Sequence, residues 1–199
     1  MTDAAHAYWP QPIRPFAITF DRSEHTMSPA GPTLVRRMSS LEGLFADQDA
    51  WKAQLEDDDP IVYTVASSPV PESPRELPQS ITVIRSGDTG GELWMTKGHQ
   101  HPDPQGEIYL GLEGEGGLLM YDGTDVSWLD MRPGTIGYIP PGWAHRSVNV
   151  GTGQYAFLAV YPGSAGHDYG WVLDHGMGQR AFRMADAFEL RPYGEPAGR

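Results

Sequence analysis

The sequence predicts an all-β domain, a sandwich or barrel of short strands joined by turns. Its 24 glycines and 18 prolines make up about a fifth of the 199 residues, against a usual share of roughly 12%. With 39% hydrophobic residues, the chain has enough apolar surface for a folded core, so this excess indicates turns rather than disorder. After Pro60, candidate strands follow one another between turn signals, which is typical of a sandwich or barrel.

The first part of the chain departs from the strand pattern. We expect residues 1–34 to form an arm, extended over residues 1–12 and followed by an edge strand over Ile13–Phe20, which contains Pro15. Between Ser40 and Glu56 the apolar residues recur at helical spacing, and Ser40 and Asp47 are candidate N-caps. One or two short helices are therefore expected before the acidic run that ends at Pro60.

From residue 61 onwards the pattern is typical of strands, interrupted by a proline-rich loop over residues 69–78. We expect residues 35–190 to form one domain, with 191–199 as a tail, and residues 170–190 to add strands to an outer sheet. The candidate strands are Ile61–Ala66, Ser80–Arg85, Glu92–Thr96, Glu107–Leu112, Gly117–Tyr121, Val126–Leu129, Gly134–Ile139, His145–Val150 and Gln154–Tyr161.

Charge and cysteine content exclude several classes of function. The net charge of −12 argues against nucleic acid or an anionic membrane as partner, because both require a basic surface. The absence of cysteine excludes disulfides, thiolate metal sites and thiol nucleophiles. The longest apolar stretch, Tyr155–Tyr161, is too short to span a bilayer, and no secretory signal precedes residue 12. A cytoplasmic protein is therefore expected.

Histidines are concentrated in one region of the chain. His99 and His101 lie at i and i+2, so on a strand both rings point to the same face. Glu107 begins the next candidate strand, and His145 begins a later one. Three imidazoles and one carboxylate are a ligand set for Fe2+, Mn2+, Ni2+ or Zn2+ that leaves positions open for water or substrate. The remaining histidines lack such a context and are expected to be solvated: His6, His25 and His175.

Glycines and prolines around these residues complete a wider pattern. Gly98 precedes the His-x-His pair, Gly114-Glu115-Gly116-Gly117 follows the strand that starts at Glu107, and Arg132-Pro133-Gly134 precedes His145. This order resembles the two signature motifs of the cupin superfamily, small β-barrels with an internal metal site. The resemblance implies a cupin jelly roll, or double-stranded β-helix, whose metal ligands are His99, His101, Glu107 and His145.

Three longer stretches resemble the cupin-type glucose-6-phosphate isomerases of archaea and some bacteria. They are residues 94–117, residues 138–149 and the tail over residues 161–170, which generic cupins lack. The resemblance covers residues 35–175. It implies reversible conversion of glucose 6-phosphate to fructose 6-phosphate in glycolysis and gluconeogenesis, one divalent metal ion per subunit with Fe2+ foremost, and a homodimer.

The resemblance also implies roles for individual residues. Glu107 is the candidate base, although a carboxylate that binds a metal is a weaker base. Tyr109 faces the same way and either donates to a sugar oxygen or fills the barrel as an aromatic side chain. His167 and Tyr169 are implied in substrate binding or proton transfer at O1 or O5. The implied contacts to the sugar phosphate are Tyr63, Thr82, Thr96, Gly98 and Tyr161.

Two departures and two alternative functions accompany this interpretation. The gap from His101 to Glu107 is one residue shorter than in archaeal members, and the arm is longer; neither alters a ligand. Lys97 and Arg146 are expected on the opposite strand face and are left out of the site. A cupin dioxygenase would use the same ligands on Fe2+, and a sugar-binding cupin would use the barrel without turnover. The sequence leaves open the native metal, an enediol or hydride-shift route, and activity on mannose 6-phosphate.

Overall fold

The computed structural model describes residues 13–21 and 23–194, so the expected extended arm, His6 and the last five residues lie outside the described residues. In chain order the elements are β1 (Thr19–Asp21), β2 (Thr26–Ser28), β3 (Thr33–Arg37), the 3-10 helix η1 (Met38–Leu41), α1 (Gln48–Asp57), β4 (Ile61–Ser67), β5 (Gln79–Ile84), β6 (Asp88–Thr89), β7 (Glu92–Leu93), β8 (Glu107–Glu113), β9 (Gly116–Tyr121), β10 (Val126–Met131), β11 (Ile136–Ile139), β12 (Ala144–Asn149), β13 (Tyr155–Val160), α2 (Tyr169–His175), β14 (Gln179–Arg183) and β15 (Phe188–Pro192).

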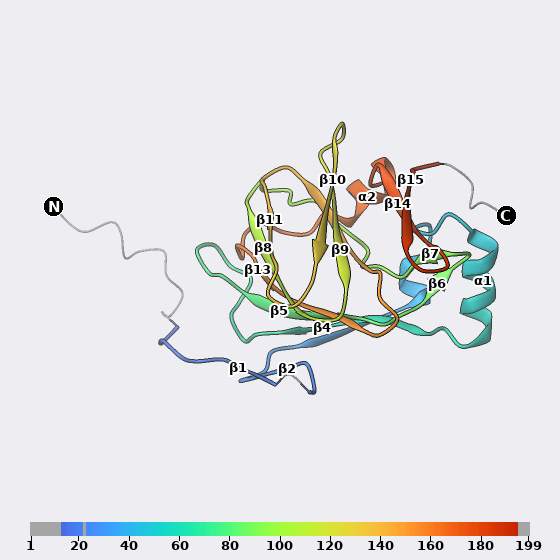
Figure 1. Cartoon of the computed structure of the whole chain (residues 1–199). Coiled ribbons are helices and arrows are strands. Elements are labelled where there is room, and N and C mark those ends of the chain that lie inside the picture. The colour runs from blue at the N-terminus through green and yellow to red at the C-terminus, as the bar shows by residue number, and fades with distance from the viewer. Residues whose placement is uncertain (1–12, 22, 195–199) are drawn as a thin grey trace.

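Two antiparallel sheets close around one apolar core (Figure 1). The larger sheet has the order β11-β8-β13-β5-β4-β3, and the smaller has the order β10-β9-β12. Met95 and His99 pair with Val148 and His145 of β12, so the segment after β7 continues the smaller sheet. The predicted all-β fold, a jelly roll of the cupin type, is confirmed. Its core residues include Ile84, Leu118, Met131, Ile139, Val148 and Phe157.

The glycines at the start of β9 allow aromatic rings to lie directly against the strand. A Cβ atom on Gly116 would lie 2.2 Å from the ring of Tyr155, and one on Gly117 would lie 1.8 Å from the ring of Trp128. Real Cβ atoms do not approach other atoms so closely, so no other residue type fits at either position without displacing a ring. Successive residues of a strand point to opposite faces, so the Gly116-Gly117 pair of the motif is explained by one ring on each face of β9: Tyr155 in the core, and Trp128 outside it against Phe188 of β15.

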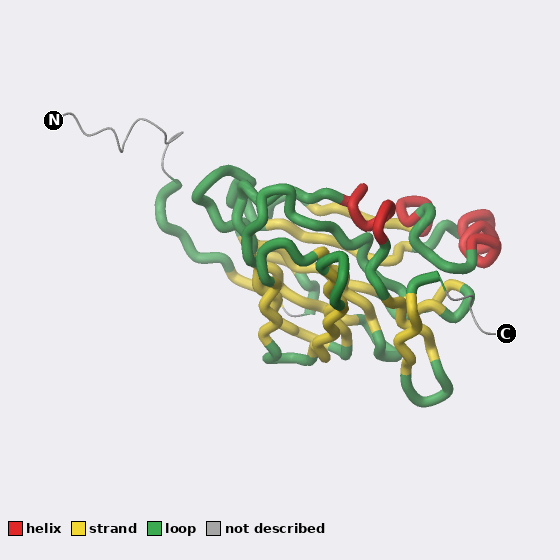
Figure 2. The backbone as a smooth tube through the Cα atoms, turned by 90° about the horizontal axis from the view of Figure 1, so that it is seen from above, coloured by secondary structure: helices red, strands yellow, loops and turns green. Residues whose placement is uncertain are grey.

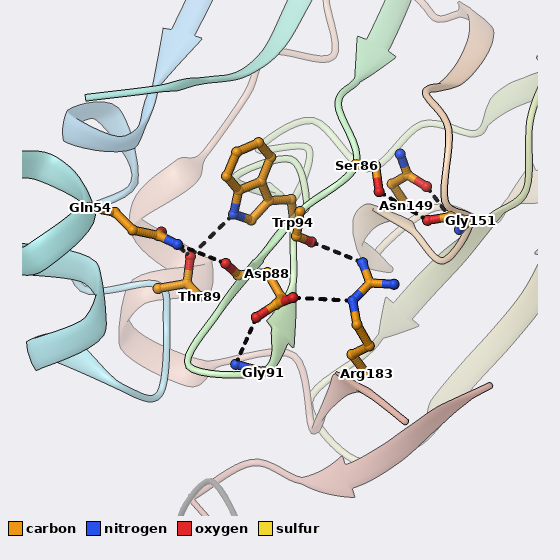
Figure 3. A network of polar contacts seen from close by, with 10 residues as sticks. Gln54, Ser86, Asp88, Thr89, Gly91, Trp94, Asn149, Gly151 and Arg183 are labelled. Atoms are coloured by element: carbon orange, nitrogen blue, oxygen red, sulfur yellow. Dashed lines mark hydrogen bonds and ion pairs between the residues drawn. The ribbon is translucent and has the colours of Figure 1, made fainter. Parts of the chain in front are cut away.

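A third sheet, in the order β15-β14-β7-β6, lies beside the barrel next to α1 (Figure 1). A polar network around Asp88 and Thr89 joins these elements (Figure 3). Asp88 accepts hydrogen bonds from the backbone N–H of Gly91 and from Nε of Arg183, both at 3.1 Å. Thr89 donates to Gln54 of α1 and accepts from the indole N–H of Trp94. Trp94 is thereby fixed just before the segment that carries His99.

Helix α1 begins where the sequence predicts. The carboxylate of Asp47 accepts hydrogen bonds from the backbone N–H groups of Asp49 and Ala50, which satisfies two donors of the first turn. Trp51 is buried, and its indole N–H donates to the carbonyl oxygen of Met38 at 2.9 Å. The N-cap predicted at Ser40 is wrong, because Ser40 lies inside η1.

A short β1–β2 hairpin covers part of the outer face of the larger sheet (Figure 1). Its apolar side chains Ile18, Phe20 and Met27 face Leu112 and Leu158 across a small cavity. The edge strand predicted over residues 13–20 is largely wrong, since regular pairing starts only at Thr19. The expectation that His25 is solvated is also wrong, because its Nε2 lies 2.8 Å from the carboxylate of Glu113.

Helix α2 is an element that the sequence analysis missed. Asp168 caps it by accepting from the backbone N–H of Trp171, and the chain leaves the helix at Gly176 with φ +73. The strands expected over residues 170–190 do form, but only from Gln179 onwards. Figure 2 shows the helices gathered on one side of the strands. None of the helices in the described part of the chain has the length and apolar character to cross a membrane.

Candidate metal centre and its cavity

Three elements bring the four predicted ligands together. His99 and His101 lie on the segment between β7 and β8, Glu107 opens β8, and His145 lies on β12. The backbones of His99 and His145 exchange two hydrogen bonds, at 3.1 and 2.9 Å, so their rings share one face of the smaller sheet. Their ring centroids are 4.2 Å apart.

The ligating atoms of these four residues, called the metal-ligand cluster below, all lie within 4.8 Å of one another and are buried. His99 Nε2, His101 Nε2, His145 Nε2 and Glu107 Oε2 have no properly oriented hydrogen-bond partner. Glu107 Oε2 does lie 3.0 Å from His145 Nε2 and 3.3 Å from His101 Nε2, so the atoms converge on one point without satisfying each other. Buried polar atoms are costly when unpaired, and a cation at the centre would satisfy all four. The residues therefore fit a metal ion.

Contacts at Nδ1 of His101 and His145 orient these two rings so that Nε2 points to the centre of the metal-ligand cluster. His101 Nδ1 lies 3.0 Å from the carbonyl oxygen of Gln105, and His145 Nδ1 lies 3.2 Å from that of Trp143. A carbonyl oxygen only accepts, so Nδ1 carries the proton and Nε2 presents its lone pair to the centre.

Electrostatics prepare the metal-ligand cluster for a divalent cation. Burial and the neighbouring imidazoles hold the pKa of His99 well below its ordinary value, so its ring is neutral. Burial alone would raise the pKa of Glu107, but the contacts with His101 and His145 outweigh it and leave the pKa lowered. Burial alone would lower the pKa of His101, but its contacts with Glu107 and the carbonyl of Gln105 leave the pKa raised, so a cation would compete with a proton at this ring. Three imidazoles and one carboxylate are a ligand set suited to a borderline divalent ion.

A cavity of about 280 Å³ opens beside the metal-ligand cluster, between the inner face of the larger sheet and the segments over residues 96–99 and 161–169. The sheet contributes polar side chains because alternate residues of β4 and β5 point inward. His101 and His145 are not part of its wall. The predicted site residues that line it are Tyr63, Thr82, Thr96, Gly98, His99, Glu107, Tyr109, Tyr161, His167 and Tyr169.

His167 and Tyr169 are held against the metal-ligand cluster by backbone pairing. The backbones of Asp168 and Gln100 exchange hydrogen bonds of 2.8 and 3.2 Å, which ties the tail segment to the His-x-His segment. The ring centroid of His167 lies 4.5 Å from that of His99. The ring of Tyr169 is nearly parallel to the ring of His167, and the centroids of these two rings are 6.1 Å apart. Burial lowers the pKa of His167, so this imidazole is neutral at neutral pH.

Tyr109 lies deep in the wall of the cavity. Its ring stacks on Phe157 with centroids 4.5 Å apart. Burial, followed by the nearby Glu107, raises the pKa of Tyr109 well above its ordinary value, so its phenol stays protonated. It can therefore donate a hydrogen bond but does not act as a base.

The cavity wall also contains Lys97 and Glu72, which the sequence analysis did not place in the site. Strand alternation placed Lys97 on the opposite face, and this prediction is wrong because Gly98 adopts φ +75 and breaks the alternation. Glu72 belongs to the proline-rich loop, and its carboxylate accepts a 2.8 Å hydrogen bond from the hydroxyl of Tyr161. No strand or helix pattern predicts where such a loop residue points. Arg146, which the sequence analysis also left out, is fully buried and is not among the residues that line the cavity.

Comparison with known proteins gives a consistent result. The family model described as "Glucose-6-phosphate isomerase (GPI)" matches residues 35–190. Glucose-6-phosphate isomerase of Pyrococcus furiosus is 44% identical over 144 residues, covering 71% of this chain and 76% of the relative. The enzyme of the same name from Thermococcus kodakarensis is 42% identical over 82% of this chain and 86% of its own. The enzyme of the same name from Sinorhizobium medicae is 33% identical, and the match covers 82% of this chain and 78% of the relative.

Among solved structures, oxalate oxidase in complex with glycolate matches with 19% identity and a TM-score of 0.40. The match covers 48% of this chain and 47% of the oxalate oxidase chain. That partial match carries no argument about function. The family model spans most of the chain, and the archaeal relatives cover more than two thirds of it. Together with the metal-ligand cluster predicted from the same stretch of sequence, these matches establish that the chain belongs to the glucose-6-phosphate isomerase family.

Proposed function

We propose that this chain catalyses the reversible conversion of glucose 6-phosphate to fructose 6-phosphate, as a metal-dependent step of glycolysis and gluconeogenesis. One arrangement carries the proposal: the metal-ligand cluster borders a polar cavity that His167 and Tyr169 also line. The relatives that carry the name of this enzyme, at 40–44% identity among the archaeal ones, support the choice of substrate.

In this proposal His99, His101, Glu107 and His145 hold one divalent ion per subunit, with Fe2+ first in order of expectation, then Mn2+, Ni2+ or Zn2+. When bound, such an ion supplies positive charge that stabilises negative charge developing on the sugar oxygens O1 and O2. Only His99 and Glu107 of the four face the cavity, so substrate meets this side of the site.

The residues of the cavity wall have the remaining roles in proton transfer and sugar binding. Glu107 is the proposed base for the proton that moves between C1 and C2, because its carboxylate belongs to both the metal-ligand cluster and the cavity. Tyr109, whose phenol stays protonated, donates to a sugar oxygen. His167 and Tyr169 bind the sugar and move a proton at O1 or O5. A direct hydride shift would use the same residues to hold the sugar but would not require the base.

The sugar phosphate is bound by hydroxyl groups and a backbone N–H in this proposal. Thr82 and Tyr63 point inward from neighbouring strands, and the backbone N–H of Lys97 contacts the Tyr63 hydroxyl at 3.4 Å. The hydroxyls of Tyr63 and Thr82 and the backbone N–H of Gly98 would donate to phosphate oxygens, without a glycine-rich loop at a helix N-terminus. The proposed contacts are Tyr63, Thr82, Thr96, Gly98 and Tyr161.

A coupled assay for fructose 6-phosphate tests the function directly. Protein treated with chelator should be inactive, and addition of Fe2+ or Mn2+ should restore turnover of glucose 6-phosphate. Absence of turnover in metal-replete protein would refute the isomerase. Oxygen uptake that depends on substrate would favour a cupin dioxygenase, and binding of the sugar phosphate without turnover would favour a sugar-binding cupin. Mannose 6-phosphate, offered in the same assay, tests the breadth of substrate.

We further propose that the enzyme is a cytoplasmic homodimer in which residues 35–190 carry the activity and residues 1–34 are an appended arm. Exposed apolar side chains on the outer face of β8 and β11 support a dimer: Ile108, Ile136 and Tyr138 are 41%, 66% and 57% exposed. Such a patch favours contact with another protein surface. Light scattering should give twice the chain mass, and Ile136→Glu should give the monomer.

A further inference from the structure

Gln100 stands between the two histidines of the His-x-His pair, but its side chain points the other way. Successive residues of an extended segment point to opposite faces, so the residue between His99 and His101 is directed away from the metal-ligand cluster. Gln100 is half-buried and is not among the residues that line the cavity. Its role therefore depends on the protein groups that its amide contacts.

The amide of Gln100 donates to the turn that precedes His145. Its Nε2 lies 2.8 Å from the carbonyl oxygen of Gly142, in the turn over residues 140–143 between β11 and β12. The backbone N–H of Trp143 closes this turn by donating to the carbonyl of Pro140 at 3.3 Å. Gly142 has φ +85, the conformation that the third residue of a type II turn requires.

The turn itself offers few groups that could hold it in place. Pro140 and Pro141 have no backbone N–H, so two of its four residues cannot donate. A Cβ atom on Gly142 would meet no other atom within 4 Å, so the turn is not packed on that side. The hydrogen bond from Gln100 ties this turn to the segment that carries His99 and His101.

The position of the turn sets the orientation of His145. The carbonyl oxygen of Trp143 lies 3.2 Å from Nδ1 of His145, which places the proton on Nδ1 and leaves the lone pair of Nε2 for the metal-ligand cluster. The peptide group held by Gln100 joins Gly142 to Trp143, so it directly precedes that carbonyl. A shift of the turn would move the Trp143 carbonyl and free the His145 ring to rotate.

The backbone of Gln100 is itself firmly held. Its N–H and carbonyl exchange hydrogen bonds of 3.2 and 2.8 Å with Asp168 of the tail. One residue earlier, the backbones of His99 and His145 exchange two more. The amide of Gln100 therefore extends from a fixed strand, so it can position the turn instead of following it.

We propose that Gln100 is a positioning residue of the metal centre: its amide holds residues 140–143 so that Trp143 keeps the ring of His145 directed at the metal-ligand cluster. Gln100 touches neither the ion nor the substrate, and it acts through Trp143 and His145. The proposal rests on the proposed function for the presence of a metal ion, but not for the identity of the sugar.

The test alters the amide and measures the binding of Co2+, an ion whose visible spectrum reports the geometry of its ligands. Gln100→Met keeps the length of the side chain without a donor, and Gln100→Asn keeps the amide but is one methylene too short to reach Gly142. Gln48→Met is the matched control, because Nε2 of Gln48 also donates to a backbone carbonyl, that of Phe45, outside the metal-ligand cluster and its cavity. Competition with a chelator gives the Co2+ affinity, and urea denaturation of metal-free protein shows that each variant is folded.

We expect both Gln100 variants to bind Co2+ roughly 10- to 100-fold more weakly, which is the usual effect of losing an outer contact of a metal ligand. Their Co2+ spectra at saturation should differ from that of the unaltered protein, because the ring of His145 is less well oriented. Gln48→Met should keep both the affinity and the spectrum.

The outcomes separate this role from the isomerase assignment. Unchanged Co2+ affinity in both Gln100 variants would overturn the positioning role and leave the metal site intact. Weaker binding with an unchanged spectrum would overturn it too, because the ligands would have kept their geometry. If the unaltered protein binds no divalent ion, the proposed metal site fails and the positioning role fails with it. Weaker binding and an altered spectrum in protein that does not isomerise glucose 6-phosphate would support the positioning role and refute only the isomerase.

Discussion

The guanidinium of Arg146 donates two hydrogen bonds to the carbonyl oxygen of Lys97, from Nη2 at 2.7 Å and from Nε at 3.2 Å. Arg146 is completely buried, and it directly follows His145 of the metal-ligand cluster. A Cβ atom on Gly98 would lie 3.1 Å from the Cβ of Arg146, so the two segments are in close contact. One side chain thus fixes the backbone that leads to His99 and His101.

Arg146→Met should therefore disturb metal binding without removing a ligand. It leaves the carbonyl of Lys97 without its charged donor, which should lower the free energy of unfolding by about 1.5–3 kcal/mol. Arg146→Lys keeps one charged donor, so it should recover part of the metal affinity and part of the free energy of unfolding. Metal titration and urea denaturation measure the two effects. If Arg146→Met bound metal as tightly as the unaltered protein, the positioning role would be excluded.

Removing a histidine from the metal-ligand cluster should remove the metal itself. His145→Ala takes away one of the four converging atoms and leaves Glu107 without its 3.0 Å neighbour. We expect the purified variant to contain little metal and to show no isomerase activity. His175→Ala is the matched control, since His175 lies outside the metal-ligand cluster at the exposed end of α2. Full metal content in His145→Ala would show that the ligand assignment is wrong.

Most of this site could be predicted because its residues lie in or next to regular strands with strong turn signals. His99, Glu107 and His145 stand near the glycines of a pattern that resembles the cupin motifs, and the ligand set predicted from that resemblance converges in the structure. The core of the fold was predictable for the same reason. Alternating strands after residue 61 specify which faces turn inward.

The parts that could not be predicted depend on contacts that are remote in sequence. Lys97 enters the cavity because Gly98 has a positive φ, which no alternation rule includes. Glu72 is placed by the packing of its loop against the tail, where the backbone of Gly163 donates to the carbonyl of Glu76. Helix α2 has only seven residues, too few to show a helical period.

Tyr169→Phe should separate catalysis from metal binding. The ring lies nearly parallel to that of His167, so phenylalanine keeps this packing and removes only the hydroxyl. We expect metal content and stability to be unchanged, and kcat to fall by roughly 10²- to 10⁴-fold, the usual contribution of a proton-transfer group. A variant with normal kcat and a raised KM would instead assign Tyr169 to binding alone.

The two carboxylates of the cavity can be distinguished by Glu107→Gln and Glu72→Gln. Glu107→Gln should lose both metal and turnover. Glu72→Gln keeps an acceptor for the Tyr161 hydroxyl but removes a negative charge from the cavity, so it should retain metal and turnover and lower KM by roughly two- to fivefold at low salt. Steady-state kinetics at two ionic strengths check this. A collapse of kcat in Glu72→Gln with full metal content would identify Glu72 as the base.

The ion pair between Arg180 and Glu92 should be costly to break, because both groups are buried. Arg180 Nη1 lies 2.8 Å from Glu92 Oε1 and also donates to the carbonyl of Leu44, and the guanidinium stacks 3.8 Å from the ring centroid of Tyr193. Glu92 is fully buried and accepts from the backbone N–H of Ala46 as well. The pair therefore joins β7, β14 and the loop before α1.

Arg180→Met leaves Glu92 buried without its partner, so the free energy of unfolding should fall by about 3–5 kcal/mol. The double variant Glu92→Leu with Arg180→Met removes the unpaired charge and should recover part of this loss. Recovery stays incomplete because the backbone N–H of Ala46 and the carbonyl of Leu44 each lose a partner. Urea denaturation of metal-replete protein measures both values. A loss below about 1 kcal/mol in Arg180→Met would mean that the pair contributes no more than a surface ion pair.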